Sequence, residues 1–534
     1  MDSLQQQDAL ALLSGDEAVA LAAFEAGVKL GTGYPGTPST EILETFEKLG
    51  GRAQWSPNEK VALEVGVGVA FAGARALVTM KHVGLNVAAD PLFTVAYTRL
   101  DGALVIVSAD DPGMASSQNE QDNRRYALAA GVPMLEPSDS QEAYEFTLRA
   151  IEISERWQVP VLLRMTTRVC HSKTIVRRGT VAIPPPHAPH FEHDFPSRVM
   201  IPAYAKPAHR RLRQTLAEIA AWNDETGNGE AGNGKIGNGR AGLNQLITCS
   251  KSLGIITSGV AFQHVREVAP EASVLKLGLT YPLPIERMRA FAAGVERCVV
   301  IEEGDPYLVE GARTAGIKVE GKPESFRFGE LNTARVRRIL EGDTTPEPKP
   351  APGKPPALCP GCPHRSVYAA LKELNCIVAG DIGCYSLGVL PPFEAMDTLV
   401  CMGAAPGQAG GERAGRQHLR AQRHHRPGRD GLQPAPERPC AGDPRQRDHG
   451  HDGHAGASGD RAHALSRQDR QSGLRGSGAF RRGAQCARDR SRAGAGKISG
   501  IDSKMPGLAG NFRGDCPPGV PAGDSLDSRV REVQ

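Results

Sequence analysis

Short apolar runs alternate with helix-forming segments through the first part of the chain. The run A-L-V-T-M at 76–80 is followed by A-L-V-I-V-S at 103–108 and V-P-V-L-L-R-M at 159–165, and a helix over 16–27 precedes a strand at 31–34. Continuous apolar strands separated by helices are typical of a parallel sheet covered by helices on both faces. Residues 8–200 are therefore predicted to form one α/β domain.

A second α/β unit is predicted at 248–340, and a third unit begins at 358. The second unit takes its strands from 253–257, 273–277 and 298–302. The G-N-G repeat within 223–247 lacks the side chains to build a core, so that range is predicted to be a flexible linker. The Pro-rich stretch 341–357 is predicted to be an extended linker.

The composition changes abruptly after Ala404. Residues 405–534 contain 21 Arg but only 2 Lys, no Tyr or Trp, and only 11 Ile, Leu and Val together. Genuine basic tails mix Lys with Arg, whereas GC-rich DNA read in a wrong frame yields Arg, Gly, Ala, Pro and His. We therefore interpret 405–534 as an out-of-frame segment and expect it to be disordered, with the third unit, 358–404, cut short.

Charge and cysteine usage narrow the class of protein. The tail carries a net charge of +9 and residues 1–404 carry −6, so the folded part has no basic footprint for nucleic acid. There is no apolar stretch long enough to span a membrane and no basic region followed by an apolar one at the N-terminus. Eleven irregularly spaced cysteines indicate reduced thiols. We expect a cytoplasmic protein with no membrane or nucleic-acid partner.

The segment Tyr34-Pro35-Gly36-Thr37-Pro38 joins a strand to a helix. Thr37 fits the N-cap of that helix with Pro38 at its first position, so the segment has a purely structural interpretation as a capped helix start. It also has a functional one, in which backbone N–H groups and the Thr37 hydroxyl bind an anionic substrate.

Two other segments have the same double interpretation. Glu59 opens a helix rich in small residues, where a carboxylate also has a favourable interaction with the helix dipole. The polar run 110–124 follows a strand, which makes it either a solvated loop or a ligand loop at the carboxyl end of a parallel sheet.

Cys359 and Cys362 stand at metal-ligand spacing, with Cys384 downstream. Zinc requires four N or S ligands and an iron–sulfur cluster requires four thiolates. No fourth ligand is evident, so a pair of structural thiols remains the alternative.

Four motifs together resemble one family. They are similar to motifs of the indolepyruvate ferredoxin oxidoreductase large subunits, which are thiamine diphosphate-dependent 2-oxoacid:ferredoxin oxidoreductases. The motifs are Y-P-G-T-P-S-T-E, D-D-P-G-M-A-S-S-Q-N-E-Q-D-N-R, C-P-G-C-P-H-R and G-D-I-G-C-Y. The resemblance covers about residues 8–404. It implies a pyrimidine-binding domain at 8–200, a transketolase C-terminal-like domain at 248–340 and a truncated diphosphate-binding domain at 358–404.

The resemblance also implies roles for single residues. Glu59 falls where the family has its activating glutamate, which bonds the aminopyrimidine ring of thiamine diphosphate and is the expected catalytic residue. The expected cofactor-binding residues are Tyr34, Pro35, Gly36, Thr37, Glu59, Asp381, Gly383, Cys384 and Gly403. Those expected to bind substrate are Thr37, His82 and Asn119. Cys359, Cys362 and Cys384 align with ligands of a [4Fe-4S] cluster.

The implied activity is oxidative decarboxylation of aryl 2-oxoacids such as indolepyruvate to acyl-coenzyme A, with a small beta subunit, ferredoxin and coenzyme A as partners.

Back-translation of 417–465, read from the second base of each codon, admits a Gly-Asp followed by an apolar strand that ends in Asn. Such an Asp and Asn are oxygen ligands for the Mg²⁺ that holds a diphosphate, and this pattern is missing from the chain as written. The alternatives are therefore an inactive or artefactual frameshifted chain, or a binding protein with an Arg/Gly-rich nucleic-acid-associating tail. The tail contains only two aromatics for base stacking, Phe480 and Phe512.

Overall fold

The computed structural model describes residues 10–179, 181, 185–186, 188–226, 229–230, 242–348, 356–403 and 408. The segment 405–534, which we predict to be out of frame and disordered, lies outside these residues apart from Gln408, as does most of the G-N-G repeat. No helix in the described part of the chain combines the length and apolar character that crossing a membrane requires.

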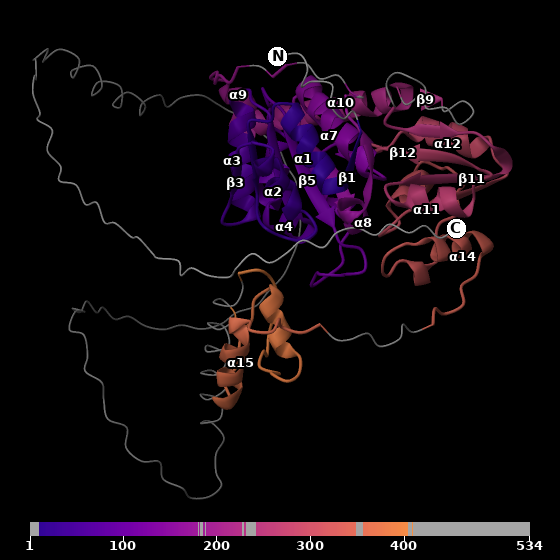
Figure 1. The fold of residues 1–534 in the computed structure, drawn as a ribbon. Helices are drawn as coiled ribbons and strands as arrows, with labels where there is room; N and C mark the ends of the chain where they lie inside the picture. Colours follow the sequence, from indigo (N-terminus) through magenta and orange to yellow (C-terminus); the bar gives the residue numbers. More distant parts are fainter. Residues whose placement is uncertain are drawn as a thin grey trace, which may run out of the picture. The chain divides into compact units, whose positions relative to one another are not determined.

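A seven-stranded sheet forms the centre of the first domain (Figure 1). Its strand order is β13-β6-β7-β5-β4-β2-β3, and all neighbours are parallel except β13 and β6. The strands are β2 (Leu30–Gly33), β3 (Ala53–Trp55), β4 (Ala76–Lys81), β5 (Leu104–Asp110), β6 (Met134–Leu135), β7 (Val161–Thr166) and β13 (Leu279–Tyr281). A small antiparallel pair, β1 (Leu10–Ser14) with β8 (Lys173–Arg177), stands beside it.

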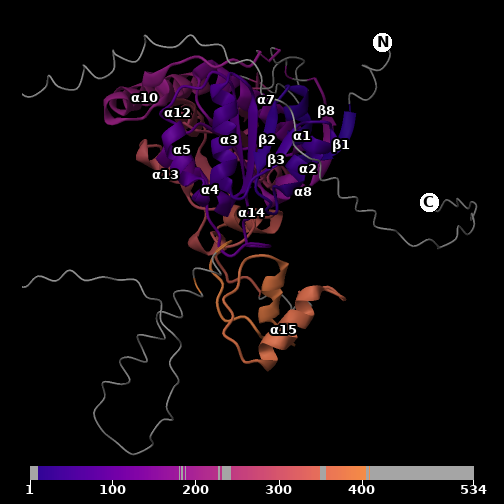
Figure 2. The same cartoon turned by 90° about the vertical axis from the view of Figure 1, so that its left-hand side faces the viewer.

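Alternate side chains of this sheet enter two separate cores. Leu77 and Val105 pack in one core with residues of α1, α2 and α7, while Val78 and Ile106 pack in the other with residues of α3 and α5. Figure 2 shows α3 in front of the sheet, in line with its packing against β2 and β4. The predicted parallel sheet with helices on both faces is confirmed.

The helices of this domain begin and end as follows: α1 (Gly15–Glu25), α2 (Thr40–Lys48), α3 (Glu59–Phe71), α4 (His82–Val87), α5 (Ala89–Val95), α6 (Arg124–Ala130), α7 (Ser140–Trp157), α8 (Thr167–His171), α9 (Phe195–Arg198) and α10 (Pro202–Thr226).

A five-stranded sheet of order β14-β11-β12-β10-β9 forms the second unit. The three predicted strands, β14, β11 and β12, are parallel, whereas β10 pairs antiparallel with β12. Helices α11 and α14 pack on one face, and α12 and α13 pack on the other. The elements are β9 (Gly229–Glu230), β10 (Gln245–Ile247), β11 (Ser250–Ser258), β12 (Ala272–Leu277), β14 (Arg297–Ile301), α11 (Ala261–Val268), α12 (Ile285–Ala293), α13 (Tyr307–Thr314), η2 (Glu324–Phe326) and α14 (Thr333–Glu341).

The range 223–247 was predicted to be a linker, and its two ends are not. Asn223 lies in α10, and the range closes with β10. Asn223 and Asn244 are both buried, and the Asn244 amide donates to Asn223 Oδ1 over 2.6 Å. Asn223 also donates to the carbonyl of Leu279, and Gly278 N–H donates to Asn244 Oδ1. Each buried amide group is thus satisfied by a partner, which the composition of the repeat does not reveal.

The segment 356–403 is small and contains little regular structure. It has one helix, α15 (Pro363–Glu373), a 3₁₀ segment, η3 (Cys384–Val389), and a single parallel bridge between Ala379 and Thr398. Its core consists of Leu358, Tyr368, Phe393, Ala395 and Met396. One bridge forms in this segment, and no strand extends from it. The predicted domain boundaries stay predictions.

Candidate functional site

Four neighbouring strands bring the sequence-predicted residues of the first domain to one edge of the sheet. The order β5-β4-β2-β3 is parallel throughout, so the carboxyl ends of all four strands lie together. Tyr34 follows β2, Glu59 comes shortly after β3, His82 follows β4 and Asn119 lies in the loop after β5. The carboxyl edge of a parallel sheet is where α/β proteins bind ligands.

Glu59 is the first residue of α3, and its side chain is almost completely buried, with 5% exposed. The N-cap of α3 is Asn58, whose Oδ1 accepts from Val61 N–H over 3.0 Å, so Glu59 is not needed as a cap. Burial raises the pKa of Glu59, and its own backbone N–H offsets part of that effect. A carboxyl in this setting holds a proton more readily than an exposed glutamate does.

The walls around Glu59 include Tyr34, Asn86 and Asn119, which line the same cavity. The backbone of Gly84 lies directly against the Glu59 side chain, because a Cβ added at Gly84 would stand 2.5 Å from Glu59 Oε1. Gly84 is a site residue that sequence reasoning missed. In the sequence, the only indication of this role is that the residue about one helical turn after the end of β4 is a glycine and has no side chain.

His82 and Asn119, both predicted to contact substrate, are brought together. His82 Nε2 lies 3.2 Å from the backbone oxygen of Asn119. The His82 ring is completely buried, and its backbone carbonyl accepts from the amides of Gln121 and Asn123. These contacts fix the loop after β5 against the start of α4, and the proposed roles in substrate binding remain proposals.

The loop over 110–124 is anchored at both ends rather than freely solvated. Asp111 accepts from Ser116 N–H over 2.9 Å, from the Ser117 hydroxyl and from the Thr167 hydroxyl. Although burial acts to raise it, these hydrogen bonds lower the pKa of Asp111. Lys81 Nζ donates to the carbonyl of Ser116 over 2.7 Å and ties the middle of the loop to β4.

The far end of this loop belongs to the scaffold. Arg124 is completely buried, donates to both oxygens of Asp122 and donates to Glu302 Oε2 over 2.7 Å. Arg164, also buried, donates to Asp110 Oδ2 over 2.7 Å and to Glu136. Asp122 and Arg124 therefore join the first sheet to the second unit.

The Tyr34–Pro38 segment differs in detail from the prediction. Helix α2 begins at Thr40 with Ser39 as its N-cap, so Thr37 does not cap the helix. The turn closes two residues later than expected because Gly36 N–H donates to the Thr40 hydroxyl over 2.9 Å and the Ser39 hydroxyl donates to Gly36 O over 3.0 Å. Pro35 and Thr37 are exposed. The capping interpretation of Thr37 is therefore wrong, and its expected roles in cofactor and substrate binding stay predictions.

In the segment 356–403, Asp381 and Gly403 are brought together. Asp381 Oδ1 accepts from the N–H groups of Gly403, over 2.6 Å, and of Ile382. Gly383 precedes η3, which Cys384 opens with an exposed side chain. The predicted cysteine ligands are not gathered: within the described residues, Cys359, Cys362 and Cys384 do not form a group at ligand distance. Cys362 Sγ lies instead 3.3 Å from His364 Nδ1.

Comparison with known proteins defines the class. The family profile described as pyruvate flavodoxin/ferredoxin oxidoreductase, thiamine diP-bdg, matches residues 21–216. The solved 2-oxoglutarate:ferredoxin oxidoreductase from Magnetococcus marinus shares the fold with a TM-score of 0.51 at 17% identity, over 64% of this chain and 66% of that one. The profile thus identifies residues 21–216 as a domain of the thiamine diphosphate-dependent 2-oxoacid oxidoreductase class, and the solved structure shares its fold.

Curated relatives narrow the family. Indolepyruvate oxidoreductase subunit IorA of Methanothermobacter thermautotrophicus is 40% identical over 76% of this chain and 69% of its own length. The IorA proteins of Archaeoglobus fulgidus and Pyrococcus abyssi are 36% and 37% identical over 75% of this chain and 67% and 65% of their own lengths. The chain belongs to the IorA family of indolepyruvate oxidoreductase subunits.

We predict that Glu59→Gln raises the stability of the cofactor-free protein at neutral pH. The folded state raises the pKa of Glu59 above its unfolded value. Protonated Glu59 therefore contributes stability, relative to the glutamine variant, when the pH is below the pKa that Glu59 has in the unfolded chain. This contribution is lost as the pH rises through the pKa that Glu59 has in the folded protein. Urea denaturation of both proteins between acidic and neutral pH checks this. A difference that is constant with pH would contradict it.

Proposed function

We propose that the chain descends from the large subunit of a ferredoxin-dependent oxidoreductase that decarboxylates aryl 2-oxoacids such as indolepyruvate, with coenzyme A as acyl acceptor. The observation that carries this proposal is Glu59: a buried carboxyl with a raised pKa, faced by Gly84, at the carboxyl edge of a parallel sheet. The identity to IorA proteins supports the aryl substrate.

The residues present fit the aminopyrimidine end of thiamine diphosphate. Glu59 lies in a cavity that it shares with Tyr34 and Asn119, and its protonated carboxyl can donate a hydrogen bond to a ring nitrogen. Gly84 leaves room for that carboxyl beside α4. When bound, thiamine diphosphate supplies the electron sink for decarboxylation. Glu59 would hold a proton at its carboxyl and pass it to and from the ring.

The sequence as written lacks the residues expected to bind the diphosphate group of the cofactor. The Mg²⁺ ligands expected for the family are an Asp and an Asn on either side of an apolar strand, and only the proposed shifted frame would supply them.

The test of the function is activity after restoration of the frame. The restored large subunit, produced with the small subunit, should reduce ferredoxin when indolepyruvate and coenzyme A are supplied. Phenylpyruvate should be a comparable substrate, and pyruvate and 2-oxoglutarate should be poor ones. Equal or better turnover of the aliphatic acids would overturn the substrate class while leaving the reaction type intact.

The chain as written should bind no thiamine diphosphate. The diphosphate and its Mg²⁺ carry most of the charge of the cofactor, and their oxygen ligands are missing. Calorimetric titration of the purified chain with thiamine diphosphate and Mg²⁺ should give no heat beyond dilution, and the restored chain serves as control. Micromolar binding by the unrestored chain would mean that other residues supply the clamp.

The nucleic-acid alternative has a direct readout as well. A binding protein with an Arg-rich tail should retain RNA at moderate salt, with an affinity that falls steeply as salt rises. Confirmation by mass spectrometry that the tail is translated as written would be the first requirement for this alternative.

A further inference from the structure

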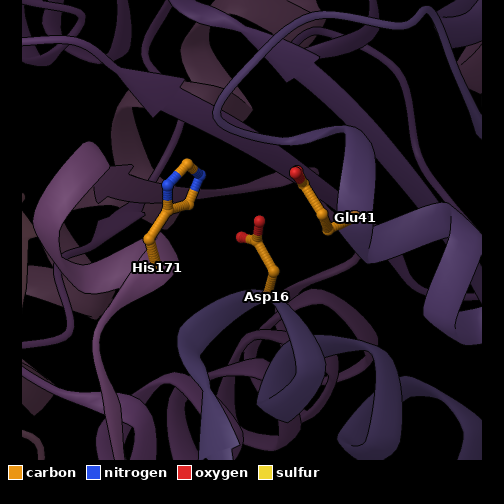
Figure 3. Close-up of side chains that lie close together, drawn as sticks. All are labelled: Asp16, Glu41 and His171. Atoms are coloured by element: carbon orange, nitrogen blue, oxygen red, sulfur yellow. The ribbon is translucent and has the colours of Figure 1, made fainter. Parts of the chain in front are cut away.

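Three side chains from separate elements converge away from Glu59. They are Asp16 from the first turn of α1, Glu41 from the first turn of α2 and His171 from the end of α8. Each offers one ligand atom, and these atoms all lie within 4.8 Å of one another. Figure 3 shows the Asp16 carboxylate between the imidazole ring and the Glu41 carboxylate, with all three side chains pointing toward one another.

Asp16 has no structural partner that would account for its burial. It is 1% exposed, and within the described residues neither carboxylate oxygen accepts from a nitrogen or oxygen donor; only the Cys170 thiol, a weak donor, lies beside it. The start of α1 is capped by others: Ser14 Oγ accepts from Glu17 N–H over 3.2 Å, and Glu17 Oε2 accepts from Ser14 N–H over 2.8 Å. A buried carboxylate without a partner is costly, so its retention calls for a ligand or a proton.

The neighbouring groups do not neutralise Asp16. Lys173 is paired with Glu17, with Nζ 3.2 Å from Oε2. The Cys170 thiol, a weak donor, only partly offsets the burial that raises the pKa of Asp16.

The three side chains open onto space for an ion and its waters. A cavity of about 260 Å³ is bordered by Asp16, Glu41 and His171, and Glu44 and Lys48 lie on its rim. Glu41 and His171 are exposed, which gives an ion a path from solvent to the buried Asp16.

We infer that Asp16, Glu41 and His171 bind one divalent transition-metal ion that ties α1, α2 and α8 together. Two carboxylates and one imidazole are a ligand set that suits Zn²⁺, Mn²⁺ or Fe²⁺, whereas Mg²⁺ and Ca²⁺ take oxygen ligands. Three protein ligands leave positions for water, which the adjoining cavity accommodates.

The site would also restrain the loop at the predicted cofactor edge. Glu41 directly follows Thr40, whose hydroxyl accepts from Gly36 N–H. An ion held by Glu41 and Asp16 fixes the first turn of α2 against α1, and with it the turn that starts at Gly36. This site does not depend on the proposed function, because its ligands lie on α1, α2 and α8 and not around Glu59.

The test compares metal binding by the full chain and three variants. Asp16→Asn keeps the shape of the side chain and mimics the protonated carboxyl, so it should fold. His171→Gln removes the imidazole at an exposed position. Glu44→Gln is the matched control, since Glu44 is an exposed carboxylate on the same helix and the same cavity but outside the three ligands. The probe is Mn²⁺ or Zn²⁺ alone, after treatment with a chelator.

In equilibrium dialysis, wild type and Glu44→Gln should bind one more ion per chain than Asp16→Asn and His171→Gln. Ions held by cysteines or by histidines elsewhere cancel in this difference. The same metal should raise the melting temperature of wild type and Glu44→Gln more than that of Asp16→Asn. Equal stoichiometry and equal stabilisation in wild type and Asp16→Asn would overturn the inference.

Discussion

Replacement of Arg124 by alanine is expected to lower the free energy of unfolding by about 3–5 kcal/mol. Arg124 is buried with Asp122 and Glu302, and its guanidinium also donates to the carbonyls of Glu303 and Asp305. Removing it leaves the buried Glu302 without its ion-pair partner and leaves Asp122 with only the longer contact to Arg164, at 3.6 Å. Buried carboxylates of this kind cannot be hydrated in place. Chemical denaturation monitored by circular dichroism measures the loss.

Arg125 is the matched control for this prediction. It is the next residue of α6, and its ion pair with Glu310 over 2.7 Å is solvent-exposed. An exposed pair contributes at most about 1 kcal/mol, so Arg125→Ala should change stability little. Similar losses for the two variants would show that the network around Arg124 is not the source of the effect.

Glu59→Gln is expected to lower the turnover of the frame-restored enzyme by roughly 10²–10⁴-fold, the usual contribution of a positioned acid–base group. The amide keeps the shape of the side chain and one hydrogen bond, but it cannot take up or release the proton. Binding of thiamine diphosphate should therefore be largely retained. Steady-state reduction of ferredoxin and calorimetric titration of the cofactor separate the two effects.

Glu64→Gln is the control for Glu59, because Glu64 is an exposed carboxylate on the same helix. It should leave turnover unchanged. If the Glu59→Gln enzyme kept the turnover of the restored wild type, the assignment of Glu59 as the proton-carrying group would be wrong.

The strands that could be predicted from the sequence are those buried on both faces. In β5 every residue is buried, and side chains of the strand enter the two cores in alternation, so a continuous apolar run was a sufficient signal. The edge positions of the candidate site followed from parallel strand order. The assignment of Glu59 itself came from the family resemblance, because a glutamate at a helix start has an ordinary electrostatic explanation.

The features that were missed depend on contacts between distant parts of the chain. Asn223 and Asn244 look like linker residues in the sequence, but inside the protein Asn244 donates to Asn223 Oδ1 and both side chains bond to the segment around Leu279. Asp122 and Arg124 were grouped with a ligand loop, although their partner Glu302 lies far along the chain. Asp16 and His171 are separated by most of the first domain, so no local pattern could place them together.

One strand of the seven-stranded sheet comes from the part of the chain that forms the second unit. β13, Leu279–Tyr281, pairs with β6 at the edge of the seven-stranded sheet, and side chains of both sheets share one core. A fragment that ends at the predicted boundary near residue 247 would leave β6 with an unpaired edge, which is a template for aggregation. The boundary seen in the sequence is therefore not a line along which the protein can be divided. We therefore expect proteolytic fragments, truncated chains and fusion proteins to remain folded only when they keep residues 10–342 together.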